Sequence, residues 1–460
     1  MKGEPDFLEN LRTEMGDVRQ WLDRVVVIAY AVLAGLAIVC FTLLADAAFG
    51  FYQSLRSAAW WAPLLWTPLL TAGVVWTIRR WAPGTAGSGV PQLLTALAPE
   101  TPVQARSRFI SLKLSMAKIL AVSGGLLAGL SIGRQGPSVQ VAAGVMLHAR
   151  RWLSPRSGIS DRELMVAGGA AGIAAAFNTP LGGIVFAIEE LSRRLQERSS
   201  GLMLAAIVVA GLVAVSAFGN LSYFGRVRAE AVSWWSLLAP GAVVALACGL
   251  LGGLLSRLML ASFTGLPDRF CAYRRKRPVT FAALCGFAVA VIAVVSDGAA
   301  VGVGHQHTHT LLDQAAAGAT AENHQPLVFT GLKFIASWLS AWTGIPGGIF
   351  GPSLSIGAGV GADVAWLLNS PYGAALIALG MCGFLAAVTQ TPITAMIIVM
   401  EMTDGHSMVL SLMACALLAS LVSRMISRPL YSTMSSLMMR SMQRPQPPAP
   451  ADGPTESATR

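Results

Sequence analysis

Charged residues are scarce in this chain of 460 residues, because Asp, Glu, Lys and Arg together make up only 12% of it. A soluble globular domain carries about twice that share. The uncharged residues collect in long runs, and residues 25–44, 202–225 and 278–296 contain no charge at all. A helix needs about 20 apolar residues to cross the hydrocarbon of a bilayer. These runs exclude a disordered chain and predict an all-α polytopic membrane protein.

Paired cysteines and a signal peptide are also missing. The six cysteines show no C-x-x-C spacing, which excludes a secreted disulfide scaffold and predicts small buried side chains. Residues 1–23 are too polar and acidic for a signal peptide and are expected to form an amphipathic cytoplasmic helix. Residues 442–460 are polar and rich in proline. A disordered cytoplasmic tail is expected there, with no soluble regulatory domain after the last span.

The net charge of +10 would suit a nucleic-acid-binding protein, but the positions of the basic residues argue against that partner. They form short clusters between the apolar runs, at residues 79–80, 150–151, 193–194 and 274–277. Such clusters flank membrane spans and tend to lie in the cytoplasm. The pattern predicts a multi-pass protein of the cell's inner (plasma) membrane, with both termini in the cytoplasm and no nucleic-acid partner.

An internal repeat organises the chain. The pattern G-x-x-G-P-S occurs at residues 133–138 and again at 348–353, and the separation of these two copies is called the repeat interval here. A second pattern, T-P followed at a fixed spacing by Glu, occurs at 179–189 and again at 391–401, after nearly the same interval. Two motifs that recur in the same order predict two homologous membrane halves and a final helix. The expected bounds are 24–225, 233–427 and 428–441. The repeat alone leaves open whether the halves are parallel or inverted.

Each G-x-x-G-P-S motif has the features of a helix that begins inside the apolar region. Glycine allows unusual backbone angles and close approach, and proline is tolerated in the first turn of a helix. The free N–H groups and the positive dipole end at a helix start make an anion site without a full positive charge. A third turn, at residues 87–91, adds the hydroxyl of Ser88. Tight loops between spans are the alternative for any one turn, but three such turns favour an anion pathway.

Six motifs, in this order, resemble those of the CLC chloride channels and chloride/proton antiporters: GSGVP, GRQGPSVQ, PLGGIVFAIEE, GGIFGPSLSIGA, VMEMTD and PLY. The resemblance extends from about residue 25 to residue 440 and is to the compact bacterial members, which lack cytoplasmic CBS domains. It implies an inverted repeat of tilted and broken helices and a homodimer with one anion pore per subunit. It also implies chloride as substrate, no cofactor and no enzymatic activity.

The resemblance further implies a chloride site. Ser88 matches the serine whose hydroxyl binds the central chloride, and Tyr431 matches the tyrosine that donates to the same ion. The matching backbone N–H groups belong to Ile349 and Phe350 at this central site and to Arg134, Gln135 and Gly136 at an outer site. Hydroxyl and amide donors can replace the water around an anion. Serine at 88 is similar to the chloride-selective members, whereas nitrate-preferring relatives tend to carry proline there.

Residue 135 departs from the family pattern, because glutamine stands where the family has its gating glutamate. That carboxylate competes with chloride when it is charged, moves away when it is protonated, and carries the exchanged proton. Glutamine is similar in shape to the protonated glutamate but cannot titrate. The departure at this gate position therefore predicts chloride conduction without proton coupling.

Three other charged residues in or beside apolar segments are candidates for a role. Glu190 matches the internal proton-transfer glutamate of the family, and the alternative is a carboxylate that faces cytoplasmic water beside residues 193–194. Glu401 matches a buried glutamate that is expected to be structural. Lys118 matches a lysine near the pore, where its charge would make the local potential positive.

Three alternative functions remain open at this point. A coupled chloride/proton antiporter would need another carboxylate, acting with Glu190, in place of the gate. A membrane-embedded enzyme would need a metal held by His305, His307 and His309, which are expected on a solvated loop without a metal. A fluoride exporter of the same family is disfavoured by the residues of the central site, because fluoride exporters depart from this pattern.

Overall fold

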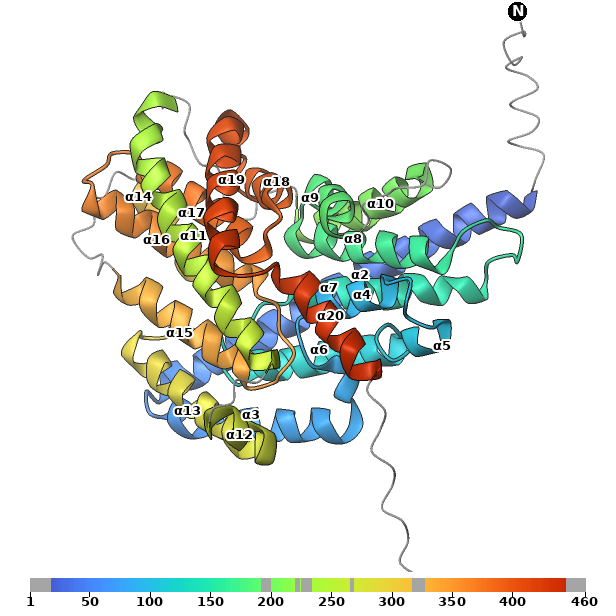
Figure 1. Ribbon diagram of the computed structural model, residues 1–460, viewed down its shortest axis with the longest axis horizontal. Coiled ribbons are helices and arrows are strands. Elements are labelled where there is room, and N and C mark those ends of the chain that lie inside the picture. The colour runs from blue at the N-terminus through green and yellow to red at the C-terminus, as the bar shows by residue number, and fades with distance from the viewer. Residues whose placement is uncertain are drawn as a thin grey trace, which may run out of the picture.

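The computed structural model describes residues 18–191, 200–219, 224, 234–264, 269–316 and 327–443. In these ranges the protein is helical, and the single β-type contact is a bridge between Gly133 and Gly348. The helices of the first half are α2 (Val18–Ala58), α3 (Ala62–Trp81), α4 (Val90–Leu97), α5 (Val103–Arg106), α6 (Leu112–Leu127), α7 (Gln135–His148), α8 (Asp161–Phe177), α9 (Pro180–Phe186) and α10 (Ser200–Phe218). Those of the second half are α11 (Trp234–Thr264), α12 (Arg269–Lys276), α13 (Pro278–Val295), α14 (His305–Ala316), α15 (Val328–Trp342), α16 (Phe350–Leu367), α17 (Gly373–Thr389), α18 (Pro392–Thr403) and α19 (Val409–Ile426), and α20 (Leu430–Gln443) follows (Figure 1).

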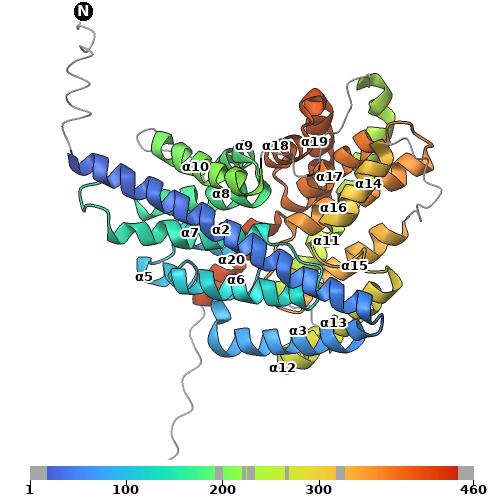
Figure 2. The ribbon, with the colours of Figure 1, turned by 180° about the vertical axis from the view of Figure 1, so that it is seen from behind.

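The helices vary widely in length, as expected for tilted and broken helices. Five stretches of the described residues are long and apolar enough to cross a membrane, and they lie in α2, α10, α11, α13 and from the residues before α19 into α20. Helices α17 and α18 are apolar but shorter. Figure 2 shows α2 running diagonally across the molecule. Large apolar side chains such as Leu69 and Leu410 are exposed, as a surface that faces lipid requires. The predicted class, an all-helical multi-pass membrane protein, is confirmed.

The two halves correspond helix by helix. Helices α3, α4, α6, α7, α8 and α9 match α13, α14, α15, α16, α17 and α18, and the first residues of each pair are separated by the repeat interval or by nearly that interval. Three helices pack directly against their own counterparts, in the pairs α3 with α13, α7 with α16 and α9 with α18. Contacts between counterparts are what a two-fold relation between repeats produces. The halves form the inverted repeat of the predicted fold class.

The ends of the predicted segments fall partly outside the described residues. Of the helix predicted at 1–23, residues 1–17 are not described, and the rest belongs to α2, which continues unbroken to Ala58. Residues 225 and 233, the predicted edges of the two halves, are not described either, so these boundaries stay predictions. The predicted final helix at 428–441 corresponds to α20. Most of the predicted tail, residues 444–460, lies outside the described ranges.

Glycine lets helices of one half approach each other backbone to backbone. A Cβ atom added at Gly357 on α16 would lie 2.2 Å from the carbonyl oxygen of Gly380 on α17. In the first half, a Cβ atom added at Gly172 on α8 would lie 2.5 Å from the carbonyl oxygen of Ser138 on α7. Small residues are the usual means by which membrane helices come this close. Helix α7 therefore packs closely against α8, and α16 packs closely against α17.

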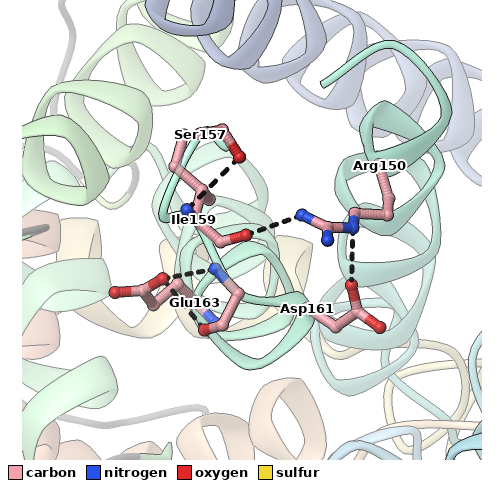
Figure 3. A network of polar contacts seen from close by, with 6 residues as sticks. Arg150, Ser157, Ile159, Asp161 and Glu163 are labelled. Atoms are coloured by element: carbon pink, nitrogen blue, oxygen red, sulfur yellow. Dashed lines mark hydrogen bonds and ion pairs between the residues drawn. The ribbon is translucent and has the colours of Figure 1, made fainter. Parts of the chain in front are cut away.

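The start of α8 shows how the sequence fixes a helix end (Figure 3). The Ser160 hydroxyl accepts a hydrogen bond from the N–H of Glu163 at 3.2 Å, and the Glu163 carboxylate accepts one from the N–H of Ser160 at 2.6 Å. Arg150 donates to the carbonyl oxygen of Ile159 at 2.8 Å and forms an ion pair with Asp161 at 3.4 Å. The two bonds between Ser160 and Glu163 form a capping box. It satisfies two N–H groups that have no partner within the helix, and it fixes where α8 begins.

Candidate functional site

The two G-x-x-G-P-S motifs cross each other. The N–H of Gly133 donates to the carbonyl oxygen of Gly348 at 2.7 Å, and the N–H of Gly348 donates to that of Gly133 at 2.6 Å. Helices α7 and α16 begin directly after this crossing, at Gln135 and Phe350. The first N–H groups of each helix have no partner within the helix. The crossing therefore brings two sets of free N–H donors together.

The turn that carries Ser88 lies against this crossing. Gly87 and Gly89 on either side have φ angles of 95° and 110°, which favour glycine strongly. A Cβ atom added at Gly136 would lie 3.4 Å from Ser88 Oγ, so the hydroxyl lies next to the start of α7. Ser88 Oγ is buried and has no hydrogen-bond partner among the described residues. The structure thus places an unused hydroxyl beside free N–H groups.

Tyr431 reaches the same place from the start of α20. Its ring stacks on that of Phe350, with centroids 5.9 Å apart and planes inclined by 23°. Its buried hydroxyl lies close enough to that of Ser88 to interact with it, but neither hydroxyl forms a hydrogen bond of normal geometry within the described chain. A buried hydroxyl without a partner costs about 1–3 kcal/mol. Three distant segments, at Ser88, Ile349–Phe350 and Tyr431, therefore meet around unused donors.

Gln135 lies between the glycines of the two motifs. Its Oε1 atom would be 2.6 Å from a Cβ atom added at Gly133 and 3.1 Å from one added at Gly351. The side chain is 1% exposed, and Oε1 has no hydrogen-bond partner among the described residues. Its far side borders a cavity of about 10 Å³, which is also lined by Val303, Gly304 and His305. A Cβ atom at either glycine would crowd the amide in its present position.

A wide vestibule of about 1200 Å³ adjoins this small cavity and shares Val303, Gly304 and His305 with it. Arg134 lines the vestibule and forms an ion pair with Asp46. The Arg134 side chain is 5% exposed. Of the predicted outer-site residues 134–136, Arg134 thus lines the vestibule and Gln135 lines the small cavity beside it.

Lys118 on α6 anchors the Ser88 turn. The side chain is fully buried, and Nζ donates to the carbonyl oxygens of Thr85 at 2.8 Å and Gly87 at 2.7 Å. Its predicted effect on the local potential stays a prediction. The anchoring could not be predicted from the sequence, because any backbone carbonyl can accept from a lysine.

Glu189 and Glu401 cap each other's helices. Glu401, near the end of α18, accepts from the N–H groups of Leu181 at 3.2 Å and Gly182 at 2.7 Å at the start of α9. Glu189, just after α9, accepts from the N–H groups of Ile393 at 3.2 Å and Thr394 at 2.7 Å at the start of α18. The expected structural role of Glu401 has this physical basis. The matching role of Glu189 was missed, although the repeated T-P motifs place the two glutamates at equivalent positions.

Replacing Glu401 by alanine is expected to destabilise the protein by about 2 kcal/mol, because two helix-start N–H groups lose their acceptor and α9 loses a negative charge at its positive end. The melting temperature in detergent measures the effect. Glu100→Ala is the control, because Glu100 is exposed outside the helices and its loss should change stability by less than about 0.5 kcal/mol. Equal melting temperatures for the two variants would show that the caps contribute nothing.

Glu190 follows in the same short turn as Glu189, a π-helical stretch at Ala187–Leu191. It is half-buried and lies within electrostatic range of the Tyr431 hydroxyl. Glu190 therefore approaches the site from the Tyr431 side, whereas Gln135 borders the vestibule. In the alternative, Glu190 faces cytoplasmic water beside residues 193–194, and these two residues lie outside the described ranges.

The prediction that the three histidines lie on a loop is wrong. They lie in the first turns of α14, which begins at His305. All three line the vestibule. His309 Nδ1 lies 2.8 Å from a carboxylate oxygen of Asp313, and the ring of His307 lies against that of Phe329, with centroids 4.0 Å apart. No group of three His, Cys, Asp or Glu residues in the described ranges is arranged to hold a metal ion. The loop that follows the apolar run ends at Gly304, directly before the helix starts.

These features define a class of protein. Half-helices start at a buried polar site, and two inverted repeats meet there through their own counterparts. Membrane transport proteins with discontinuous helices are built in this way. Residues 69–424 match the family model described as voltage gated chloride channel. The chain belongs to this family, the CLC family.

Relatives and solved structures agree with this assignment. The H(+)/Cl(-) exchange transporter ClcA of Cronobacter sakazakii is 29% identical over an alignment of 414 positions, which covers 86% of this chain and 83% of the relative. ClcA of Klebsiella pneumoniae is 28% identical over an alignment of 426 positions, which again covers 86% of this chain and 83% of the relative. A slow cyanobacterial Cl-/H+ antiporter superposes with a TM-score of 0.76 at 22% identity, over 92% of this chain and 99% of that one. A CLC-type fluoride/proton antiporter gives 0.70 at 18% identity, over 94% and 99%. The fold is thus shared by proteins named for different anions.

Proposed function

We propose that this protein conducts chloride passively and does not exchange it for protons. The observation that carries the proposal is Gln135, an amide buried between the starts of α7 and α16. An amide neither takes up nor releases a proton at physiological pH. It also brings no negative charge that would compete with an anion for the helix N–H groups.

In this proposal the donors at the crossing bind the anion. The hydroxyls of Ser88 and Tyr431 and the N–H groups of Ile349 and Phe350 form the central site, and the N–H groups of residues 134–136 form the outer site. The two buried, unpartnered hydroxyls support this assignment. Neutral donors hold an anion without trapping it, which fast passage requires. No cofactor and no catalytic step form part of the proposal.

A paired flux assay in proteoliposomes tests the function. A chloride gradient is imposed, and chloride efflux and external pH are recorded together. We expect chloride efflux with no proton movement. Chloride efflux accompanied by opposing proton movement in a fixed ratio would overturn the uncoupled mechanism, and an absence of chloride efflux would overturn the substrate.

Replacing Ser88 by alanine is expected to weaken chloride binding by roughly 10- to 100-fold, because a hydrogen bond to an ion contributes about 1.5–3 kcal/mol. Calorimetric titration with chloride measures the affinity. Ser54→Ala is the matched control, because Ser54 lines the vestibule but lies outside the proposed site. If Ser88→Ala bound chloride as tightly as Ser54→Ala, the central site would have to lie elsewhere.

A coupled antiporter is the second candidate. The relatives above are named as proton/chloride exchangers, and Glu190 lies within electrostatic range of Tyr431. Coupling would then need a second carboxylate at the vestibule side. The pH record of the flux assay distinguishes the two candidates.

We also propose a homodimer in the inner membrane with both termini in the cytoplasm. Helices α9 and α18 and the π-helical stretch after α9 expose Leu181, Ile393 and Ile188 on their surface. They also carry the capping carboxylates at partly exposed positions, where hydrocarbon would be a poor environment for charge. A second copy of the protein that covers this face would shield these carboxylates from the lipid hydrocarbon. Chemical cross-linking across Leu181→Cys tests the contact.

A further inference from the structure

A second buried lysine repeats the position of Lys118. Lys333 on α15 follows Lys118 by the same repeat interval that separates the two G-x-x-G-P-S motifs. Both side chains are fully buried. Neither ammonium forms an ion pair within the described residues; instead, Lys333 Nζ donates to the carbonyl oxygens of Gly302 at 2.8 Å and Val301 at 3.4 Å. Each lysine therefore holds a loop by its carbonyl groups.

The two loops have the same backbone form. Gly302 and Gly304 have φ angles of 65° and 88°, and they follow Gly87 and Gly89 by the repeat interval. Each loop leads directly into a helix, α4 in the first half and α14 in the second. Both pairs of glycines have positive φ angles, lie at equivalent positions of the two halves and are followed directly by a helix. The loop at 301–304 is therefore a second copy of the Ser88 turn.

The two loops differ in the residue between their glycines. Ser88 stands in the first, and Val303 stands in the second. Val303 and Gly304 border both the vestibule and the small cavity beside Gln135. The second loop thus borders the proposed anion path on the vestibule side of Gln135. At this border the isopropyl group of Val303 stands in place of a hydroxyl donor.

We propose that Lys333 is a positioning residue of the anion path, which holds the Val303 loop at its vestibule end as Lys118 holds the Ser88 turn. The carbonyl oxygens of Val301 and Gly302 accept hydrogen bonds from the ammonium group. The positive charge offsets their partial negative charge, which would otherwise repel an anion near the path. The Val303 loop binds chloride more weakly than the Ser88 turn, because valine has no hydroxyl donor. The proposal rests on the proposed function, because it assumes that an anion passes Gln135.

Two substitutions test the proposal in the flux assay, with chloride KM, turnover and the ratio of chloride to nitrate flux as readouts. Lys333→Met is expected to raise the chloride KM roughly tenfold, as the loss of charge-assisted hydrogen bonds predicts, and to lower the chloride-to-nitrate ratio because a loosened loop admits the larger ion. Lys113→Met is the control, because Lys113 is an exposed lysine on α6.

Val303→Ser converts the second loop into a copy of the first and should raise the chloride-to-nitrate ratio roughly fivefold, because it adds one hydroxyl donor. Val303→Ala is its control, because it enlarges the space without adding a donor. This pair also keeps the test decisive if Lys333→Met does not fold.

The outcomes separate the two proposals. Absence of chloride flux in the unmodified protein would overturn the proposed function itself. Normal flux with a folded Lys333→Met variant whose KM and selectivity equal those of Lys113→Met would overturn the role of Lys333. Equal selectivity of Val303→Ser and Val303→Ala would show that the loop does not face the anion, and would overturn the proposal as well.

Discussion

Replacing Gln135 by glutamate is expected to make chloride flux depend steeply on pH. The new carboxyl would lie beside the free N–H groups at the crossing, and its charged form would compete with chloride for them. Its protonated form has the shape of the present amide. Flux should therefore be highest in acid and fall by at least about tenfold between pH 5 and pH 7, since the protonated fraction of a single carboxyl changes about tenfold per pH unit above its titration point.

The measurement is chloride efflux from proteoliposomes over this pH range, with external pH recorded at the same time. Opposing proton movement in the variant would support the proposed role of Glu190 as the inner proton site. Gln53→Glu is the control, because it adds a carboxyl to the vestibule but not to the crossing. A pH profile for Gln135→Glu as flat as that of the control would mean that residue 135 does not gate the path.

Replacing Gly357 by alanine is expected to destabilise the protein by about 3 kcal/mol or to prevent folding. The added Cβ atom would lie 2.2 Å from the carbonyl oxygen of Gly380, and a backbone atom cannot rotate away as a side chain can. Overpacking of a core usually costs about 1–3 kcal/mol, and a collision with backbone lies at the upper end. Because α16 begins at Phe350, its displacement would also disturb the proposed chloride site.

The melting temperature and the fraction of monodisperse protein after purification measure this effect. Gly331→Ala is the matched control, because Gly331 also lies within a helix but a Cβ atom there would meet nothing within 4 Å. That variant should be as stable as the original or more so by up to about 1 kcal/mol. Similar melting temperatures for both variants would show that α16 and α17 can move apart at little cost.

The repeat made much of the fold predictable. Its nearly constant interval paired the two G-x-x-G-P-S motifs, and likewise Glu189 with Glu401, before any contact was known. What the interval could not show is that the motifs hydrogen-bond to each other, or that each glutamate caps the helix of the other half. Such contacts depend on the two-fold arrangement in space, which equal spacing along a chain does not specify.

The residues that meet at the crossing could be named from the sequence, but the contacts that hold them in place could not. Ser88, Gln135 and Tyr431 could be placed from motifs, because each motif has a distinctive order of glycine, proline or aromatic residues. The lysine anchors could not be found in this way, since their partners are backbone carbonyls. The repeat interval would have revealed Lys333 as the counterpart of Lys118, and His305 as the counterpart of Val90, the first residue of α4. The match of His305 to Val90 would have indicated that the histidines begin a helix and do not lie on a loop.

The exchange of caps between α9 and α18 has a consequence for synthesis on the ribosome. The N–H of Gly182 is satisfied by a carboxylate that lies 219 residues further along the chain. At about 5–20 residues per second, that carboxylate emerges roughly 10–40 s after the helix start it serves. During this interval the first half is already in the translocation machinery or the bilayer with an unfinished helix end. Its α9 can therefore settle only after nearly the whole second half has been made, so late truncation of the chain should leave the first half incompletely folded as well.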